Sequence, residues 1–194
     1  MPVRPRARRV AVREVLGTAL DLERKVMELY VALVRAFPRP EEVRNFWFGM
    51  ARHEAGHCGA LLLVEAIVKV DPEREAGAKV WFDQAVVTRL RSLLGAYGHE
   101  LREGVTLERA LEMAVDLEGS ELEDLVVDLL GVVRSERWRD RAVQMMIHDM
   151  GELSYMVERY TKNEDLLARA DALIEQRRGG LNKLKPRAAR TART

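Results

Sequence analysis

The chain has 194 residues and a formal net charge of +1; 47% of its residues are hydrophobic and 32% are charged. This composition is typical of a globular protein rich in exposed helix. No apolar run approaches the roughly 18 residues that a membrane-spanning helix needs, and the basic N-terminus lacks the apolar stretch of a secretory signal. Cys58 is the single cysteine, which excludes an intramolecular disulfide and a Cys-x-x-Cys metal site. We therefore expect a cytoplasmic protein without a membrane partner.

The near-neutral total conceals an uneven distribution of charge. Residues 1–9 carry four arginines and residues 177–194 carry seven basic side chains, and neither segment contains an acid. The remaining 21 basic and 31 acidic residues lie between them. We predict a basic tail over 1–9, a bundle domain over 10–176 and a basic tail over 177–194. The tails are interpreted as solvated segments, with nucleic acid or another acidic surface as the alternative partner.

Helix signals are clear in the first half of the chain. A first helix is predicted over residues 10–37, where Pro38 and Pro40 stop it. A second helix runs over residues 40–70, beginning with a proline and two acids that suit a first turn. After a connecting region, apolar residues at helical spacing predict an extra helix over residues 81–101.

The second half of the chain also contains signals for helix boundaries. Thr106 is a candidate N-cap for a helix that reaches Leu130, and Ser135 is a candidate cap for a helix over residues 136–161. A shorter amphipathic helix is predicted over residues 163–176. Strand signals are nearly absent, because no stretch shows sustained alternation bounded by turn residues.

These elements predict an all-α fold. Short links join the first helix to the second and the third to the fourth, whereas about 36 residues join the second to the third. The arrangement is that of a four-helix bundle made of two helix hairpins, with a long crossover that carries the extra helix and a short C-terminal helix at the end.

The two halves repeat the same short patterns. Residues 19–23 read Ala-Leu-Asp-Leu-Glu and residues 114–118 read Ala-Val-Asp-Leu-Glu. Residues 53–57 read His-Glu-Ala-Gly-His and residues 148–152 read His-Asp-Met-Gly-Glu. Both pairs are offset by 95 positions, and two matches in one register predict a duplicated helix hairpin.

The repeated positions place acids on apolar helix faces. Residues three apart share a face of a helix, so Glu54 and His57 project together, as do Asp149 and Glu152. Apolar residues surround both pairs, and a carboxylate on the inward face of a bundle is costly unless a cation compensates it. No arginine or lysine stands at a matching spacing, so we predict bound metal ions. The candidate ligands are Glu23, Glu54, His57, Glu118, Asp149 and Glu152.

This pattern, a glutamate on the first and third helices and an i,i+3 pair on the second and fourth, resembles the ligand set of the ferritin-like di-iron carboxylate proteins. The rubrerythrin branch is the most similar: Tyr30 lies seven residues after Glu23, and Glu121 lies three after Glu118. The resemblance covers roughly residues 10–161. It implies a ferritin-like bundle, two bound Fe ions with Mn as the alternative, and Glu121 and Tyr30 as catalytic residues, Glu121 also being a mobile metal ligand.

By the same resemblance, Glu54 and either Asp149 or Glu152 would bridge the metals, with Glu23, Glu118 and His57 as further ligands. The chain also departs from the family. Asp149 and Glu152 stand where Glu-x-x-His is usual, which makes the site more anionic and favours Fe or Mn. Leu125 replaces a tyrosine, and the rubredoxin-like Cys-x-x-Cys domain is missing, so an external electron donor is implied.

Three functions are compatible with these residues. The first is a di-metal oxidoreductase, most simply a di-iron one, that acts on peroxide or on Fe(II) and oxygen, as a homodimer or higher homo-oligomer. The second is a non-catalytic, iron-sequestering or DNA-associated binding protein, in which the basic tails tether an acidic body. The third is a bundle that has lost its metal and serves as an interaction module, an alternative kept open by Asp149 and Glu152.

Overall fold

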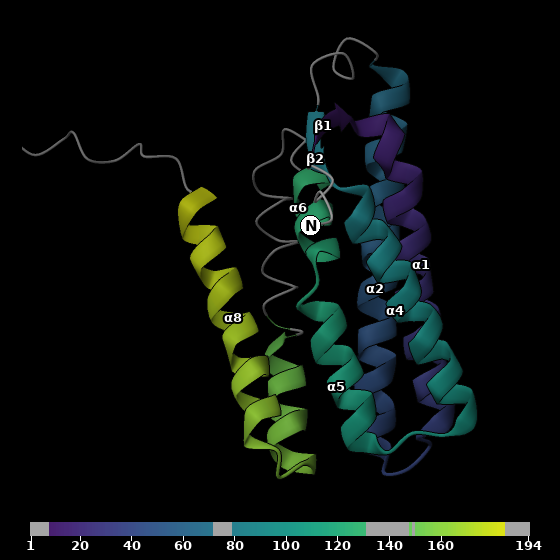
Figure 1. Ribbon diagram of the computed structural model, residues 1–194, viewed down its shortest axis with the longest axis vertical. Coiled ribbons are helices and arrows are strands. Elements are labelled where there is room, and N and C mark those ends of the chain that lie inside the picture. Colours follow the sequence, from purple (N-terminus) through teal and green to yellow (C-terminus); the bar gives the residue numbers. More distant parts are fainter. Residues whose placement is uncertain (1–7, 72–78, 131–147, 149, 185–194) are drawn as a thin grey trace, which may run out of the picture.

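The computed structural model describes residues 8–71, 79–130, 148 and 150–184, with the backbone alone for residues 121, 123 and 177–184. These ranges form an all-α bundle with one small sheet (Figure 1). The elements are β1 (Arg8–Ala11), α1 (Val12–Ala36), α2 (Glu41–Val70), β2 (Lys79–Phe82), α4 (Gln84–Glu103), α5 (Leu107–Glu118), α6 (Glu121–Leu130) and α8 (Glu164–Leu184). Residues 150–160 form a further helix. None of the described helices has the length and apolar character needed to cross a bilayer.

The first hairpin follows the sequence prediction closely. Buried residues recur every three or four positions along α1 from Val12 to Leu33, the spacing of one helix face. Prolines interrupt the chain after α1, and α2 then begins with two acids in its first turn, where negative charge stabilises a helix N-terminus. The bounds of both predicted helices are confirmed to within two residues.

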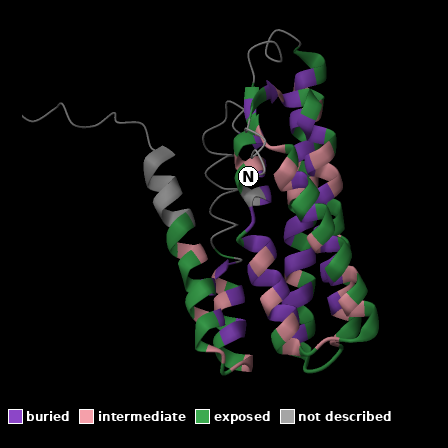
Figure 2. Cartoon of the chain, viewed as in Figure 1, coloured by how far each residue is buried: buried purple, intermediate pink, exposed green. Residues whose placement is uncertain are grey.

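The remaining helices assemble around this hairpin. α1 packs against α2 on one side and α4 on the other, and α6 contacts both α1 and α2. α5 packs against α8, which stands at the outer edge of the bundle (Figure 1). The buried residues lie on the helix sides that face one another, so a single apolar core runs through the described part of the chain (Figure 2).

The helix over residues 150–160 runs antiparallel to α2 and is hydrogen-bonded to it. Near its C-terminal end, Tyr155 Oη (3.1 Å), Arg159 Nε (2.9 Å) and Tyr160 Oη (2.6 Å) all donate hydrogen bonds to the carboxylate of Glu42 in the first turn of α2. Near its N-terminal end, a carboxylate oxygen of Glu152 would lie 3.8 Å from a Cβ placed on Gly49, further along α2. The described part of the predicted fourth helix therefore packs against α2.

The sheet corrects the expectation that strands are absent. β1 and β2 pair antiparallel, with Arg8 opposite Phe82 and Ala11 opposite Lys79. Strands of four residues are too short to show the alternation that identifies a strand in sequence. As a result, Arg8 and Arg9, which the charge distribution placed in the N-terminal tail, belong to an ordered strand.

The crossover helix begins later than predicted. Trp81, expected as its first residue, lies in β2, and α4 begins at Gln84. The reason is the N-cap: the side chain of Asp83 accepts a hydrogen bond from the backbone N–H of Ala85 at 2.8 Å. The apolar spacing predicted the helix correctly. The same spacing extends back into β2, so it does not show where α4 begins.

The predicted third helix is divided in two. Thr106 caps α5 as predicted, since its hydroxyl accepts from the backbone N–H of Arg109 at 3.2 Å. The helix is then interrupted at Gly119 and Ser120, and α6 begins at Glu121. A Cβ at Gly119 would lie 2.9 Å from Leu173 Cδ2 of α8 and 3.0 Å from the carbonyl oxygen of Val115. Glycine therefore allows α8 to approach this end of α5.

Several predictions fall on residues outside the described ranges. These are the turn over 131–135 with its cap Ser135, residues 136–147 of the predicted fourth helix, and the outer parts of both basic tails at 1–7 and 185–194. The C-terminal helix extends beyond its predicted end at 176, because α8 continues to Leu184. The predicted boundary of the second tail thus falls inside a helix.

The close approach at Gly119 generates a stability prediction. We expect Gly119→Ala to lower the free energy of unfolding by about 1–2 kcal/mol, because the added methyl group overpacks against α8. Gly17→Ala is the matched control, since a Cβ at that exposed position in α1 meets nothing within 4 Å. The control should gain about 0.5–1 kcal/mol through higher helix propensity. Urea unfolding measures both, and equal behaviour of the two variants would contradict the packing argument.

Candidate metal centre

Three of the predicted ligands come together between α1 and α2. Glu23 belongs to the buried series of α1, and Glu54 and His57 lie one turn apart on α2. One ligand atom from each of the three lies within 4.8 Å of the others. Glu23 is fully buried, Glu54 is 2% exposed, and the His57 side chain is partly buried. The hairpin thus brings two carboxylates and an imidazole into one enclosed group.

The imidazole lies close to both acids and is hydrogen-bonded to Glu23. His57 Nδ1–H donates to Glu23 Oε2 at 3.1 Å, and the same nitrogen lies 3.3 Å from Glu54 Oε2 without forming a hydrogen bond. Glu23 Oε1 and Glu54 Oε2 are buried and have no hydrogen-bond partner within the described residues. Over the same residues, neither carboxylate forms an ion pair with a lysine or an arginine. Such oxygens carry a desolvation cost that a cation would remove.

The two carboxyl groups differ in acidity although they are neighbours. Burial, and then the adjacent Glu23 carboxylate, raise the pKa of Glu54 well above its ordinary value. Burial also acts to raise the pKa of Glu23, but hydrogen bonds from Glu54 and His57 outweigh it, so this pKa lies below its ordinary value. Without a metal, Glu54 therefore holds a proton and Glu23 carries the negative charge.

The donor set fits a metal ion. Two carboxylates and one imidazole are the ligand types that borderline and hard divalent cations accept, and Fe, Mn and Zn all use them. The two buried oxygens without partners point to the same conclusion, because a bound cation would satisfy both. The group Glu23, Glu54 and His57 could therefore hold a metal ion.

Glu118 is buried, as predicted, but it has a different partner. Tyr30 Oη donates a hydrogen bond of 2.7 Å to Glu118 Oε1, which links α1 to the end of α5. Tyr30 lies two helical turns from Glu23, about 10 Å along the axis of α1. Glu118 is not part of the group formed by Glu23, Glu54 and His57. The two predicted site residues Tyr30 and Glu118 thus form a second buried polar contact, between α1 and α5.

An aromatic cluster covers this second contact. The Tyr30 ring stacks on Trp47 with centroids 6.0 Å apart, and Trp47 also contacts Phe46 at 4.7 Å. Trp47 is fully buried, and its indole Nε1 has no hydrogen-bond partner within the described residues. The sequence indicated Trp47 as apolar packing on α2, and its stack with the tyrosine depends on how the two helices are rotated.

Among the side chains that the structure describes, no acid of the second half joins the group. The Glu152 side chain is 47% exposed and lies beside Gly49, five residues before Glu54 and about 7 Å from it along α2. Glu121 begins α6, but its side chain is outside the described part, as is all of Asp149. The duplicated sequence pattern therefore does not give two equivalent groups among the described residues.

Two neighbouring residues complete the surroundings. His53, directly before Glu54, is buried, and its Nε2 lies 3.3 Å from a guanidinium nitrogen of Arg52. The corresponding position of the second half is also a histidine, His148. This repetition is the sequence signal that singles out His53. Cys58, expected to be buried, is partly exposed; burial and the Glu23 carboxylate raise the pKa of its thiol, which favours the protonated form.

Comparison with known proteins identifies no relative. No protein-family model, no curated protein and no solved structure matches the chain. The similarity to ferritin-like proteins therefore rests on the residue pattern alone, and the function must be inferred from the chemistry of the site.

The pKa of Glu54 predicts how the metal-free protein responds to pH. Below the ordinary value of 4.5, Glu54 is protonated in both the folded and the unfolded state, and its stabilising contribution is fully present. Above that value the folded state holds one more proton, so stability falls by about 1.4 kcal/mol per pH unit until the raised pKa is passed. Glu23 acts in the opposite window, because its lowered pKa costs stability only as the pH falls below 4.5.

We therefore expect chelator-treated protein to lose stability from pH 5 to pH 8, as measured by urea unfolding. Glu54→Gln should remove most of this dependence, because the amide mimics the protonated acid and does not titrate. Glu65→Gln, an exposed position on the same helix, is the matched control and should keep it. A wild-type profile that is flat between pH 5 and pH 8 would contradict a buried, protonated Glu54.

Proposed function

We propose that this protein is a di-metal carboxylate oxidoreductase, most simply di-iron, that reduces peroxide or oxidises Fe(II) with oxygen or peroxide. The observation that carries the proposal is the enclosed group of Glu23, Glu54 and His57, with two buried carboxylate oxygens that have no hydrogen-bond partner. The resemblance of the ligand spacing to rubrerythrin-like proteins supports the same assignment. Iron at such a site would supply Lewis acidity and one-electron redox chemistry.

The first metal position is assigned to the enclosed group. Glu23, which is ionised in the folded protein, offers a carboxylate at once, whereas Glu54 must release its proton before it can bind a cation. His57 offers an imidazole nitrogen. Metal uptake at this position is therefore coupled to release of a proton.

The second metal position is assigned to acids of the second half. Glu118 is 5% exposed and is held by the Tyr30 phenol, so it is the one buried acid of that half within the described residues. Tyr30 orients Glu118 and places a proton at its Oε1 atom. The other ligands proposed for this position are Glu121, Asp149 and Glu152, with Glu121 as the mobile member.

Metal analysis tests the proposal directly. We expect protein loaded with Fe(II) under anaerobic conditions to hold close to two ions per chain by elemental mass spectrometry. Replacing Glu54 and His57 together by alanine should reduce this content to well under one ion per chain. Because metal binding stabilises the folded state, wild-type protein should also unfold at a higher temperature with Fe(II) than without it.

A paired substitution on the same helix controls for general effects. Glu65 and Lys69 form an exposed ion pair on α2, and their replacement by alanine should leave the metal content unchanged. A full metal complement in the Glu54 and His57 variant would show that the site lies elsewhere. Loss of metal in both variants would point to a damaged fold and would be recognised by circular dichroism.

Turnover separates catalysis from storage. We expect the loaded protein to consume peroxide repeatedly when an external reductant is supplied, with the iron content remaining near two per chain. Tyr30→Phe should retain the metal of the first position and lower the rate by about tenfold or more, the loss typical of one missing proton-donating group. Accumulation of many Fe(III) ions per chain without peroxide turnover would favour the iron-sequestering alternative.

A further inference from the structure

A groove lies between α1 and α4, apart from the metal centre. Its volume is about 710 Å³, within the range of small-molecule sites in proteins. Its lining residues run from Lys25 to Ala36 on α1 and from Arg91 to Arg102 on α4, so it extends about 16 Å along each helix. The groove is therefore long enough for an elongated ligand.

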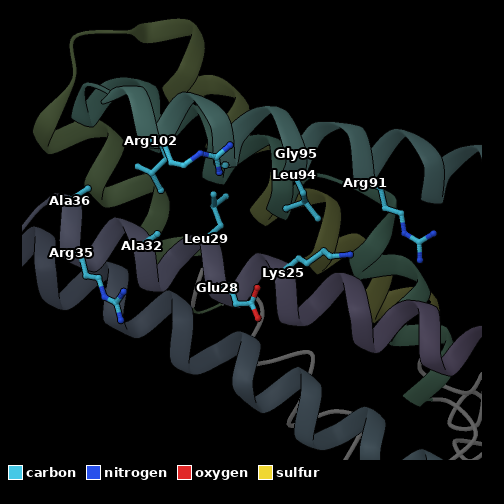
Figure 3. A pocket seen from close by; sticks show the side chains of 12 residues that line it. Lys25, Glu28, Leu29, Ala32, Arg35, Ala36, Arg91, Leu94, Gly95 and Arg102 are labelled. Carbon is cyan, nitrogen blue, oxygen red and sulfur yellow. The ribbon is translucent and has the colours of Figure 1, made fainter.

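The floor of the groove is apolar. Leu29 and Leu94 occupy the gap between the two helices, with Ala32 on α1 beside them (Figure 3). Leu29 and Leu94 are 6% and 7% exposed, so they belong to the core and form a fixed surface. A ligand that lies on this floor must therefore have an apolar body.

The rim of the groove is basic. Four cationic side chains and a single acid, Glu28, line it, although the domain around it carries an excess of acids. At one end, Lys25 and Arg91 share the carboxylate of Asp21, at 2.8 Å and 3.3 Å. At the other end, Arg35 and Arg102 form no ion pair within the described residues. The uncompensated positive charge is thus concentrated at the end formed by Arg35 and Arg102.

Two glycines of α4 keep the groove open. A Cβ at Gly95 would meet nothing within 4 Å, and a Cβ at Gly98 would lie 3.8 Å from a guanidinium nitrogen of Arg102. Glycine inside a helix costs about 0.5–1 kcal/mol relative to alanine, and packing within the chain does not require it at Gly95. The guanidinium of Arg102 lies over this glycine surface, along the groove (Figure 3).

We propose that the groove between α1 and α4 binds a free, medium- or long-chain carboxylate, with its alkyl chain on the leucine floor and its carboxylate at Arg35 and Arg102. Charge complementarity selects the anionic head, because these two arginines can donate charge-assisted hydrogen bonds to it. The volume and length of the groove favour a single extended molecule over a protein helix, which would need a longer and flatter face. The site uses the outer face of α1, whereas the metal centre uses the buried face.

Calorimetric titration of the full chain with sodium decanoate tests the proposal. We expect saturable binding of decanoate, much weaker binding of butyrate, which lacks the chain, and none of decylammonium, which carries the opposite charge on the same chain. Equal binding of decanoate and decylammonium would overturn the role of the basic rim. Binding to anionic phospholipid vesicles without binding of decanoate would overturn the free carboxylate as the occupant.

Variants locate the binding. Gly95→Leu should abolish it, because the side chain occupies the groove, and leucine favours helix more than glycine does. Arg35→Gln with Arg102→Gln should weaken binding by about tenfold or more, as expected when charge-assisted hydrogen bonds to the head are lost. Arg89→Gln, at an exposed position of α4 that does not line the groove, is the matched control and should bind like the wild type.

Melting temperature and metal content confirm that each variant is folded. The metal content should not change, because the groove and the group of Glu23, Glu54 and His57 lie on different faces of α1, and the melting temperature should not fall. If Gly95→Leu does not fold, decanoate binding by the double arginine variant still tests the proposal. Wild-type affinity in a folded Gly95→Leu protein, or in the double arginine variant, would refute the proposal.

Discussion

Two carboxyl groups buried beside one imidazole are the constraint around which the first hairpin is organised. Glu23 and Glu54 are withdrawn from water between α1 and α2, and among the described residues no lysine or arginine pairs with them. The folded chain can hold them in two ways: it can keep a proton on Glu54, or it can take up a cation. Each carboxylate would otherwise cost several kcal/mol, so proton binding, metal binding and stability are coupled in this protein.

The second half of the chain repeats the sequence of this hairpin, but its described residues do not repeat the enclosed group. Glu118, the counterpart of Glu23, is the last residue of α5, immediately before the break at Gly119. At that break, a side chain at position 119 would meet Leu173 of α8 and the carbonyl oxygen of Val115. Glu118 is instead held by Tyr30 from the first half. Among the described residues the halves are therefore unequal: the first holds the enclosed group of Glu23, Glu54 and His57, and the second holds one buried acid, Glu118.

The two faces of α1 lie in different chemical environments. The inner face of α1 carries Glu23 and Tyr30, which face acids and aromatic rings of the core. Its outer face carries Lys25 and Arg35, which border the groove shared with α4. The core side thus concentrates acids around the candidate metal centre, and the outer side concentrates basic side chains around the groove. Because an α-helix has a period of 3.6 residues, the acids and the basic side chains of α1 lie on different faces of the same helix.

Local patterns in the sequence determined the helices, the first hairpin and the identity of the enclosed ligands. Apolar spacing located α1 and α2, and it also predicted that Glu23 and Glu54 face inward, because both acids fall within the apolar series of their helices. The i,i+3 relation then placed His57 beside Glu54. The tertiary structure decided what no local pattern contains: the β1–β2 pairing across 70 residues, the break at Gly119 and the partner of Glu118. Each of these depends on contacts between segments distant in sequence, and those contacts are set by how whole helices pack.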